Sequence, residues 1–444
     1  MKRLLYSIAL MLLVVMPTAA QSLTESAKYF VFYYDSYDGQ KNKVKLSCKV
    51  YYENKAKPIK HILLSCHPTT TSNETVPTGS RPLDSGVSRM CGADDDSYIM
   101  ISPDYCGYGI SSHHQHPYLI HDVTARNCLD ALLPAIQASI DNGLTFRDNG
   151  ENMNGKAYVD ALLQGRIPKF SLEIVGYSQG GATALACAKL LDGDACPDEL
   201  QKGFVLHHTC CGDGPYSIFH TMKQYMEWGK PTRPDGGLDL EYPCVLPLIV
   251  AAAKEAYNDG CMRTVEVEDY FNPKFIATGI LDDLKTKNVG TGLLNTKVEQ
   301  AMPRRRPVDI LSRNIINEDG TFNTTTKEYK CFMRAMELAD LCTGWEPKHS
   351  ITFYHIPADK VVPYVNYSEG IMGKNGIGTL YKDTGLIRYI SPQYGINDCP
   401  HAAAAALKDP DIDLVPDWDK VRHDNGGKYF FLAFIFSPHV RSLD

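Results

Sequence analysis

LEIVGYSQGGATALACAKLL, residues 172–191, is the stretch that decides the fold predicted for this chain. It opens with a short apolar run, residues 172–175, which is typical of a strand covered on both faces. Residues 182–191 are rich in Ala and Leu and favour a helix. The turn between them, GYSQG at residues 176–180, has the form G-x-S-x-G of a nucleophile elbow, which lifts a serine above a sheet. Because this strained turn requires neighbours without side chains, the pattern indicates that Ser178 is a nucleophile.

Further apolar runs predict an α/β fold around this turn. The candidates for buried strands are residues 61–66, 98–102, 172–175, 203–209 and 351–356. Residues 29–34 and 43–52 favour an opening antiparallel hairpin. Apolar residues at three- and four-residue spacings over residues 129–140 predict a helix between two of the buried strands. A strand, helix, strand order implies right-handed crossovers and therefore a mostly parallel sheet.

A long insertion separates the last two buried strands. About 140 residues lie between residues 209 and 351, which is too long for a loop, and they have helical spacings. We therefore predict an inserted helical cap at residues 211–345. It would divide the core into a first part, residues 21–210, and a second part, residues 346–444. Because the strands on either side of it end at the functional loops, we expect the cap to cover Ser178 and control access to it.

A serine hydroxyl needs a histidine base, and that histidine needs an orienting carboxylate. With this type of elbow the acid and then the histidine follow the serine along the chain. Asp359 lies three residues beyond the predicted strand 351–356, in a loop where parallel sheets place functional groups. We therefore expect Asp359 to be the acid. The alternative is a turn carboxylate that caps Val361 or Val362.

Three histidines follow Asp359 and are candidates for the base: His401, His423 and His439. We expect His401, because it lies in a loop directly before a predicted helix, residues 402–407. His423 stands in a charged stretch, and His439 lies beyond the last predicted helix, residues 429–436. Both are expected to be solvated surface residues.

The oxyanion of an acyl-transfer reaction needs two N–H donors. Gln179 follows the serine at the start of a helix and is the first expected donor. The second should come from the loop after residues 61–66. Pro68 has no N–H, so we expect Thr69, although this loop could be purely structural.

Substrate contacts are expected from the residue before the serine and from the cap. The predicted contacts are Tyr177, Leu246 and Ile249. Part of the cap carries more apolar surface than one amphipathic face needs, so some of it could line a pocket. The alternative is that all of this surface packs in the core.

The N-terminus has the three parts of a secretory signal peptide at residues 1–20. Lys2 and Arg3 precede an apolar run, residues 4–16, and small residues end at Ala20. We expect export to the periplasm or the medium, with no stable membrane span after cleavage. The formal net charge of −7 would become −9 with the loss of these two cations, which disfavours nucleic acid as a partner.

Fourteen cysteines in an exported chain make disulfides expected, without a zinc-type spacing. The pairs considered first are Cys210 with Cys211, Cys244 with Cys261, and Cys331 with Cys342, with buried free thiols as the alternative. The histidine-rich segment 113–116 has no acidic or cysteine partner at ligand spacing, so no metal is predicted. No cofactor is implied.

Four motifs together carry a resemblance to a known family. They are residues 103–109, residues 116–118, the GYSQGG motif at 176–181 and residues 355–364. In these motifs the chain resembles the α/β-hydrolases, and among them the fungal-type secretory lipases and their bacterial relatives. This resemblance implies a triad of Ser178, Asp359 and His401. The chain differs from many esterases at residues 67–70, where it lacks their His-Gly-Gly-Gly motif.

The expected activity is ester hydrolysis through an acyl-enzyme, by an esterase or lipase. Its substrate would be a small-molecule, lipid or carbohydrate ester. The same triad serves serine peptidases that act outside the cytoplasm, which is the first alternative. The second is a catalytically silent protein that keeps the fold as a binding module.

Overall fold

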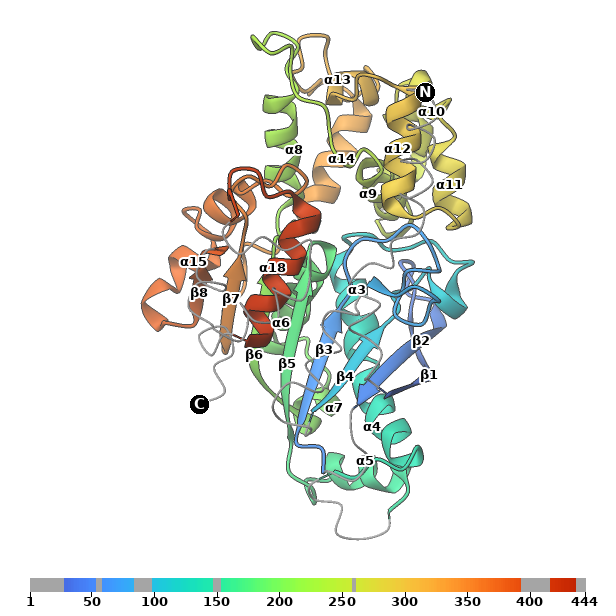
Figure 1. Ribbon diagram of the computed structural model, residues 1–444, viewed down its shortest axis with the longest axis vertical. Helices are drawn as coiled ribbons and strands as arrows, with labels where there is room; N and C mark the ends of the chain where they lie inside the picture. Colours follow the sequence, from blue (N-terminus) through green and yellow to red (C-terminus); the bar gives the residue numbers. More distant parts are fainter. Residues whose placement is uncertain are drawn as a thin grey trace, which may run out of the picture.

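The computed structural model describes residues 28–52, 58–83, 98–146, 153–257, 261–392 and 416–436. At its centre is an eight-stranded sheet in the order β1-β2-β4-β3-β5-β6-β7-β8 (Figure 1). The strands are β1 Lys28–Tyr37, β2 Lys43–Tyr52, β3 His61–Cys66, β4 Tyr98–Pro103, β5 Phe170–Tyr177, β6 Phe204–Gly212, β7 Ser350–Tyr354 and β8 Ile387–Ile390. The pairs β1-β2 and β2-β4 are antiparallel, and every pair from β4 to β8 is parallel. The predicted mostly parallel sheet is therefore confirmed.

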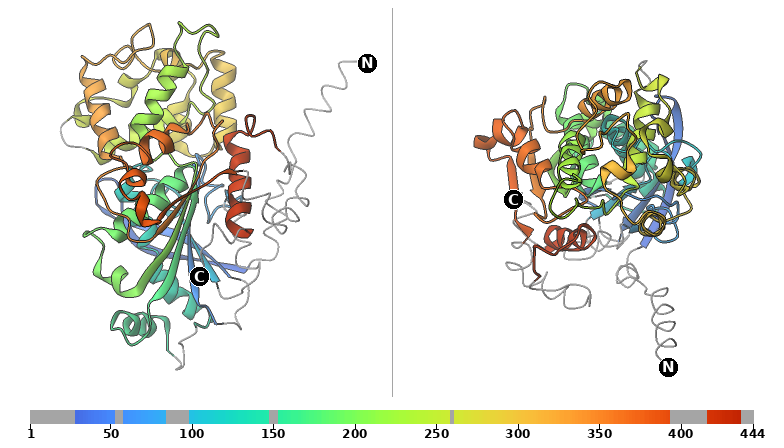
Figure 2. Two further views of the ribbon diagram at one scale, coloured as in Figure 1. Left: turned by 90° about the vertical axis from the view of Figure 1, so that its left-hand side faces the viewer. Right: turned by 90° about the horizontal axis from the view of Figure 1, so that it is seen from above.

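Alternate residues of the central strands face two different apolar layers. On β5, Leu172 and Ile174 belong to the larger core, whereas Val175 and Tyr177 belong to a smaller one on the opposite face. Helices α3, α4 and α6 pack in the larger core, and α18 covers the smaller one (Figure 2). Each large apolar side chain buried in this way contributes about 1.5–3 kcal/mol.

The helices have the following bounds. They are α3 His121–Leu129, α4 Leu132–Asp141, α5 Gly155–Leu163, α6 Gln179–Asp192, α7 Asp198–Gly203, α8 Ile218–Trp228, α9 Val245–Ala256, α10 Pro273–Ile276, α11 Ile280–Thr286, α12 Thr291–Ala301, α13 Pro307–Ile310, α14 Lys327–Leu338, α15 Ile377–Leu380 and α18 His423–Phe436. Short 3₁₀ turns lie at Gly109–Ser111, Met262–Thr264, Val267–Tyr270 and Lys382–Thr384, and a π-turn lies at Asn366–Ile371.

Helices α8 to α14 follow β6 and precede β7 in the chain. The two figures place these helices together beyond the carboxyl ends of the central strands (Figures 1 and 2). The segment is helical and inserted, as the sequence predicted. α9 is buried over most of its length, with residues from Val245 to Ala253 packed on almost every side. It is therefore an internal element of the cap.

The structure contains a disulfide between Cys261 and Cys331. It joins the segment before Met262–Thr264 to α14, within the cap. No connectivity was assigned from the sequence, and none of the three pairs considered first forms this bridge. Cys210 and Cys211 are consecutive residues of β6 whose side chains enter opposite cores, so their sulfurs cannot meet. Cys244 and Cys342 are also buried free thiols.

The sequence predicted a signal peptide and no membrane span after its removal. The proposed signal peptide, residues 1–20, lies outside the described residues. No helix in the described ranges has the length and apolar character needed to cross a membrane.

The sequence analysis did not predict strand β8. This edge strand has only four residues, and none of them is fully buried, so it lacks the apolar run of a buried strand.

Candidate active site

Ser178 occupies a sharp turn between β5 and α6. Its backbone has φ +58° and ψ −125°, a region that residues with side chains rarely adopt. The two glycines that flank it are needed for close backbone contacts. A Cβ on Gly176 would lie 2.1 Å from the carbonyl oxygen of Gly180, and one on Gly180 would lie 2.0 Å from that of Cys66. The turn thus has the strained, tightly packed backbone expected of a nucleophile elbow.

The hydroxyl of Ser178 is in contact with an imidazole and, through it, with a carboxylate. His423 Nε2 lies 2.8 Å from Ser178 Oγ, and His423 Nδ1 lies 2.5 Å from Asp359 Oδ2. The other oxygen of Asp359 accepts hydrogen bonds from the N–H groups of Val361 and Val362, at 2.8 and 2.9 Å. Asp359 therefore both caps its own turn and orients the histidine.

The histidine that meets Ser178 is His423, in the position for which the sequence favoured His401. His401 lies outside the described residues. The expectation that His423 is a solvated surface residue is wrong, because its side chain is buried, with 5% of the residue exposed. α18 begins at His423, six residues before the start predicted from its apolar pattern. His423 thus lies at the start of a helix, a position similar to the one for which the sequence favoured His401.

Two glycines in the first turn of α18 explain why its start was missed. Gly426 and Gly427 weaken a helical pattern in sequence. In the structure they allow α18 to approach the sheet closely. A Cβ on Gly426 would lie 2.2 Å from Ile356 Cδ1 and 2.5 Å from the hydroxyl oxygen of Tyr177. The glycines therefore set the position of the turn that carries His423.

Tyr177 lies beneath His423, away from the cavity at Ser178. Its hydroxyl donates to the backbone carbonyl of His423 at 2.7 Å, and its ring packs against Phe430. Tyr177 does not line that cavity in the described part of the chain. The expectation that it contacts substrate is therefore replaced by a supporting position under the imidazole.

The electrostatics of His423 are governed by opposing effects. Burial alone would lower its pKa, but the Asp359 carboxylate raises the pKa to about 9. The imidazole therefore holds a proton at neutral pH in this arrangement. A base that must accept a proton from serine becomes available as the pH rises toward 9.

The first expected oxyanion donor, Gln179, directly follows Ser178 in the chain. Gln179 is the first residue of α6, so its N–H is at a helix N-terminus. Its side-chain amide donates to Nε2 of the buried His116 at 2.8 Å. Nδ1 of His116 lies 2.9 Å from the carbonyl of Cys106, and burial lowers the pKa of His116 to about 3. This neutral imidazole fixes the Gln179 side chain and has both nitrogens occupied.

Thr69 lies in the loop after β3. Its hydroxyl shares a hydrogen bond of 3.0 Å with Tyr118, and it lines the same cavity as Ser178. The loop thus reaches the site, and the donation of the Thr69 N–H to an oxyanion stays a prediction.

The cavity at Ser178 is small and apolar. It measures about 20 Å³, which is room for roughly one water molecule. From the cap, Ile218, Val245 and Ile249 close it. Leu246 does not line it and is buried elsewhere within the cap, so only one of the two expected cap contacts lies at the site in the described residues.

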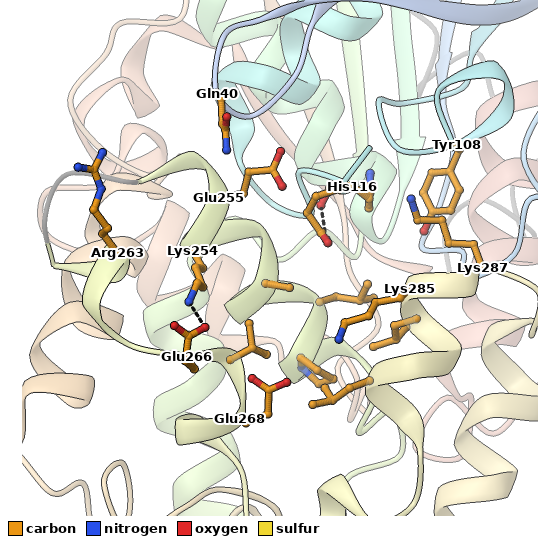
Figure 3. Close-up of a pocket in the computed structure, with 17 residues that line it drawn as sticks. Gln40, Tyr108, His116, Lys254, Glu255, Arg263, Glu266, Glu268, Lys285 and Lys287 are labelled. Carbon is orange, nitrogen blue, oxygen red and sulfur yellow. Dashed lines mark hydrogen bonds and ion pairs between the residues drawn. The ribbon is translucent and has the colours of Figure 1, made fainter. Parts of the chain in front are cut away.

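A larger cavity of about 510 Å³ lies on the other side of α9 (Figure 3). Leu248 and Ala251 of α9 line it, whereas Val245 and Ile249 line the cavity at Ser178. The larger cavity contains an ion pair between Lys254 and Glu266 (Figure 3). α9 therefore lies between the candidate nucleophile and this larger cavity.

Two groups of side chains among the described residues could in geometry hold a metal ion. They are Cys66 with Cys128 and Cys187, and Asp213 with His355 and Asp359. The first group lies in the apolar core under α6. The second adjoins His423, where Asp359 is already engaged by hydrogen bonds.

No protein-family model and no curated protein matches the chain. Solved structures do. A rice cell wall degrading esterase, LipA, from Xanthomonas oryzae superposes with a TM-score of 0.59 at 18% identity, over 82% of this chain and 83% of that one. A putative hydrolase from Legionella pneumophila gives a TM-score of 0.59 at 16% identity, over 92% and 88%. Candida antarctica lipase A gives a TM-score of 0.50 at 14% identity, over 97% and 89%. With its parallel sheet, serine elbow and helical insertion, the chain has the α/β-hydrolase fold.

Proposed function

We propose that the protein is an exported serine hydrolase that cleaves carboxylic esters through Ser178, His423 and Asp359. The observation that carries this proposal is the continuous chain of contacts from Ser178 Oγ through both ring nitrogens of His423 to Asp359. A serine, an imidazole and a carboxylate in this order are the parts of an acyl-transfer site. His423 takes the place that the sequence suggested for His401.

The proposed mechanism is an acyl transfer that this chain of contacts supports. His423 Nε2 takes the proton of Ser178 as the serine oxygen attacks the ester carbonyl. The Gln179 and Thr69 N–H groups stabilise the oxyanion of the tetrahedral intermediate. His423 then gives its proton to the leaving alcohol, and the same residue activates the water that releases the acyl group. Asp359 holds the Nδ1–H tautomer throughout.

Two observations favour an ester as the substrate, and a third favours a location outside the cytoplasm. The cavity at Ser178 is lined mainly by apolar side chains, which suits the acyl part of an ester. The solved structures that share the fold include an esterase and a lipase. The predicted signal peptide and the Cys261–Cys331 disulfide fit an oxidising compartment.

A fluorophosphonate probe tests the nucleophile. It should label the folded wild-type protein at Ser178 and leave Ser178→Ala unlabelled. Turnover of p-nitrophenyl butyrate should disappear in the same variant. Cleavage of aminoacyl nitroanilides in preference to the ester would assign the site to a peptidase. Binding without turnover of either substrate class would assign it to a silent module.

A pair of histidine variants tests the base. His423→Ala should lower kcat by at least about 10³-fold, as the loss of a triad base does. His401→Ala is the matched control and should stay close to wild-type activity. The reverse result would restore His401 as the base and reject the arrangement proposed here.

A further inference from the structure

A second carboxylate and a second imidazole lie directly behind Asp359. Asp213 follows β6 and His355 follows β7, and the two form a buried ion pair through Asp213 Oδ1 and His355 Nδ1. Asp213 is fully buried and His355 is 1% exposed. An oxygen of Asp213, a nitrogen of His355 and an oxygen of Asp359 all lie within 4.8 Å of one another. The proposed catalytic acid therefore belongs to a larger buried charge cluster.

The backbone around Asp213 holds it in this position. Its φ is +38°, in the left-handed region that residues other than glycine seldom adopt. Its N–H donates to the carbonyl of Tyr354 at 2.9 Å, and its Oδ1 accepts the N–H of Ile356 at 2.8 Å. The two hydrogen bonds flank His355 and tie the end of β6 to the end of β7. The strained residue is thus fixed to the strand that leads to Asp359.

Two carboxylates this close in a buried site would repel each other strongly without cations beside them. Asp359 is in contact with His423, and Asp213 is ion-paired with His355, which is the group that can supply a positive charge on that side of the cluster. Burial alone would lower the pKa of His355, but the ion pair with Asp213 raises it above the ordinary value. An imidazolium at His355 leaves one net negative charge on these three groups, which is the charge that a single acid would present to His423.

We propose that His355 is a positioning residue, held as an imidazolium against Asp213 and close to Asp359, and that it sets the pH at which His423 accepts the serine proton. This inference rests on the proposed function, because it concerns the base of that reaction. The negative charge of Asp213 raises the pKa of His423, and the positive charge of His355 opposes this increase. His355 touches neither the serine nor the acyl group.

Other titratable groups surround the two imidazoles and enter the same balance. The groups that face His423 are Asp359, Asp213, His355, Ser178, Tyr177 from the elbow, Tyr242 from the cap and Asp424 from its own helix. Those that face His355 are Asp213, Asp359, His423, Tyr364 and, through its backbone carbonyl, Tyr389. The proposal concerns the imidazole that is ion-paired with Asp213.

The pH dependence of kcat/KM separates this role from a structural one. In His355→Gln both carboxylates act on His423 without the cation. The acid limb of the profile should therefore move up by about 1 pH unit, so that kcat/KM one unit below the limb falls about tenfold. The double variant Asp213→Asn with His355→Gln removes one charge of each sign. Its limb should return to within a few tenths of a unit of the wild-type position. A folded His355→Gln protein whose activity falls equally at every pH, with an unmoved limb, overturns the proposal.

Nitrogen-15 NMR of histidine-labelled wild-type protein gives a second test that needs no turnover. His355 should carry protons on both ring nitrogens at pH 8, and Asp213→Asn should return it to the neutral form. The signals are assigned by their loss in His355→Gln or, should that variant not fold, by their change in Asp213→Asn. A neutral His355 at pH 8 in the wild-type protein overturns the proposal, even where the ester-hydrolase assignment holds. An inactive protein with a doubly protonated His355 would reject the proposed function alone.

Discussion

The hydroxyl of Tyr177 donates a hydrogen bond of 2.7 Å to the backbone carbonyl of His423. Tyr177 is the last residue of β5 and immediately precedes Ser178, whereas His423 is the first residue of α18. The side chain before the proposed nucleophile thus supports the residue proposed as its base. This contact joins two segments that are far apart in the chain and holds His423 in position beside Ser178.

Loss of this hydroxyl should weaken catalysis as well as stability. In Tyr177→Phe the carbonyl of His423 loses a hydrogen bond worth about 0.5–1.5 kcal/mol. The imidazole is then held less well, so kcat/KM for p-nitrophenyl butyrate should fall by up to about tenfold. Tyr354→Phe is the matched control. Tyr354 packs on the same helix through Phe430, and its buried hydroxyl has no hydrogen-bond partner in the described structure. Equal losses in the two variants would contradict a specific role for Tyr177.

A methyl group on Gly426 should displace the first turn of α18. Its Cβ would overlap Ile356 and the Tyr177 hydroxyl, so we expect a loss of about 1–3 kcal/mol in the free energy of unfolding and a larger loss of activity. Urea unfolding and ester turnover measure the two effects. Gly292→Ala on α12 is the control, because nothing lies within 4 Å of its Cβ position. That variant should keep full activity with equal or slightly higher stability. Full activity in Gly426→Ala would show that the close approach of α18 is not needed.

The sequence was sufficient for the sheet and the serine turn but not for the histidine. Residues 61–66 and 172–175 are buried on both faces, so their apolar runs identify them without tertiary information. Ser178 is identified by local constraints on two glycines. His423, in contrast, is placed by the packing of Gly426 on Ile356 and Tyr177. In sequence those glycines indicate the end of a helical pattern, and only the fold shows that they allow a close contact.

The sequence did not identify the disulfide for a similar reason. Proximity in sequence suggested Cys210 with Cys211, yet successive residues of a strand point to opposite faces. The disulfide joins Cys261 and Cys331, 70 residues apart, because their segments meet within the cap. Which helices of an insertion pack together is a tertiary property that no spacing in the chain expresses.

Ile249 should influence the length of acyl group that the site accepts. It lines the cavity at Ser178, which is too small for an acyl chain in this closed arrangement. Ile249→Ala should enlarge the cavity and shift kcat/KM toward longer p-nitrophenyl esters by up to about 1–3 kcal/mol. Leu246→Ala is the control on the same helix. It should cost about 2–5 kcal/mol of stability and leave the chain-length preference unchanged, because Leu246 does not line the cavity. The same change of preference in both variants would point to a general loosening of the cap.

The raised pKa of His423 should link stability and activity to pH in opposite directions. The ordinary pKa of 6.5 is raised to about 9 in the folded protein, so the folded state binds this proton more tightly than the unfolded chain. The resulting stabilisation is fully present below pH 6.5 and is lost as the pH rises through 9. From the size of the shift it amounts to about 3 kcal/mol. The fraction of neutral imidazole needed for general-base catalysis increases over the same interval. We therefore expect kcat/KM to rise toward pH 9 while the stabilisation by this proton declines.

Urea unfolding at pH 6 and pH 10 measures this change in stability. The free energy of unfolding should fall more between these two pH values in the wild-type protein than in His423→Gln, which lacks the titrating group. An equal drop in the two proteins would show that the proton on His423 does not stabilise the fold.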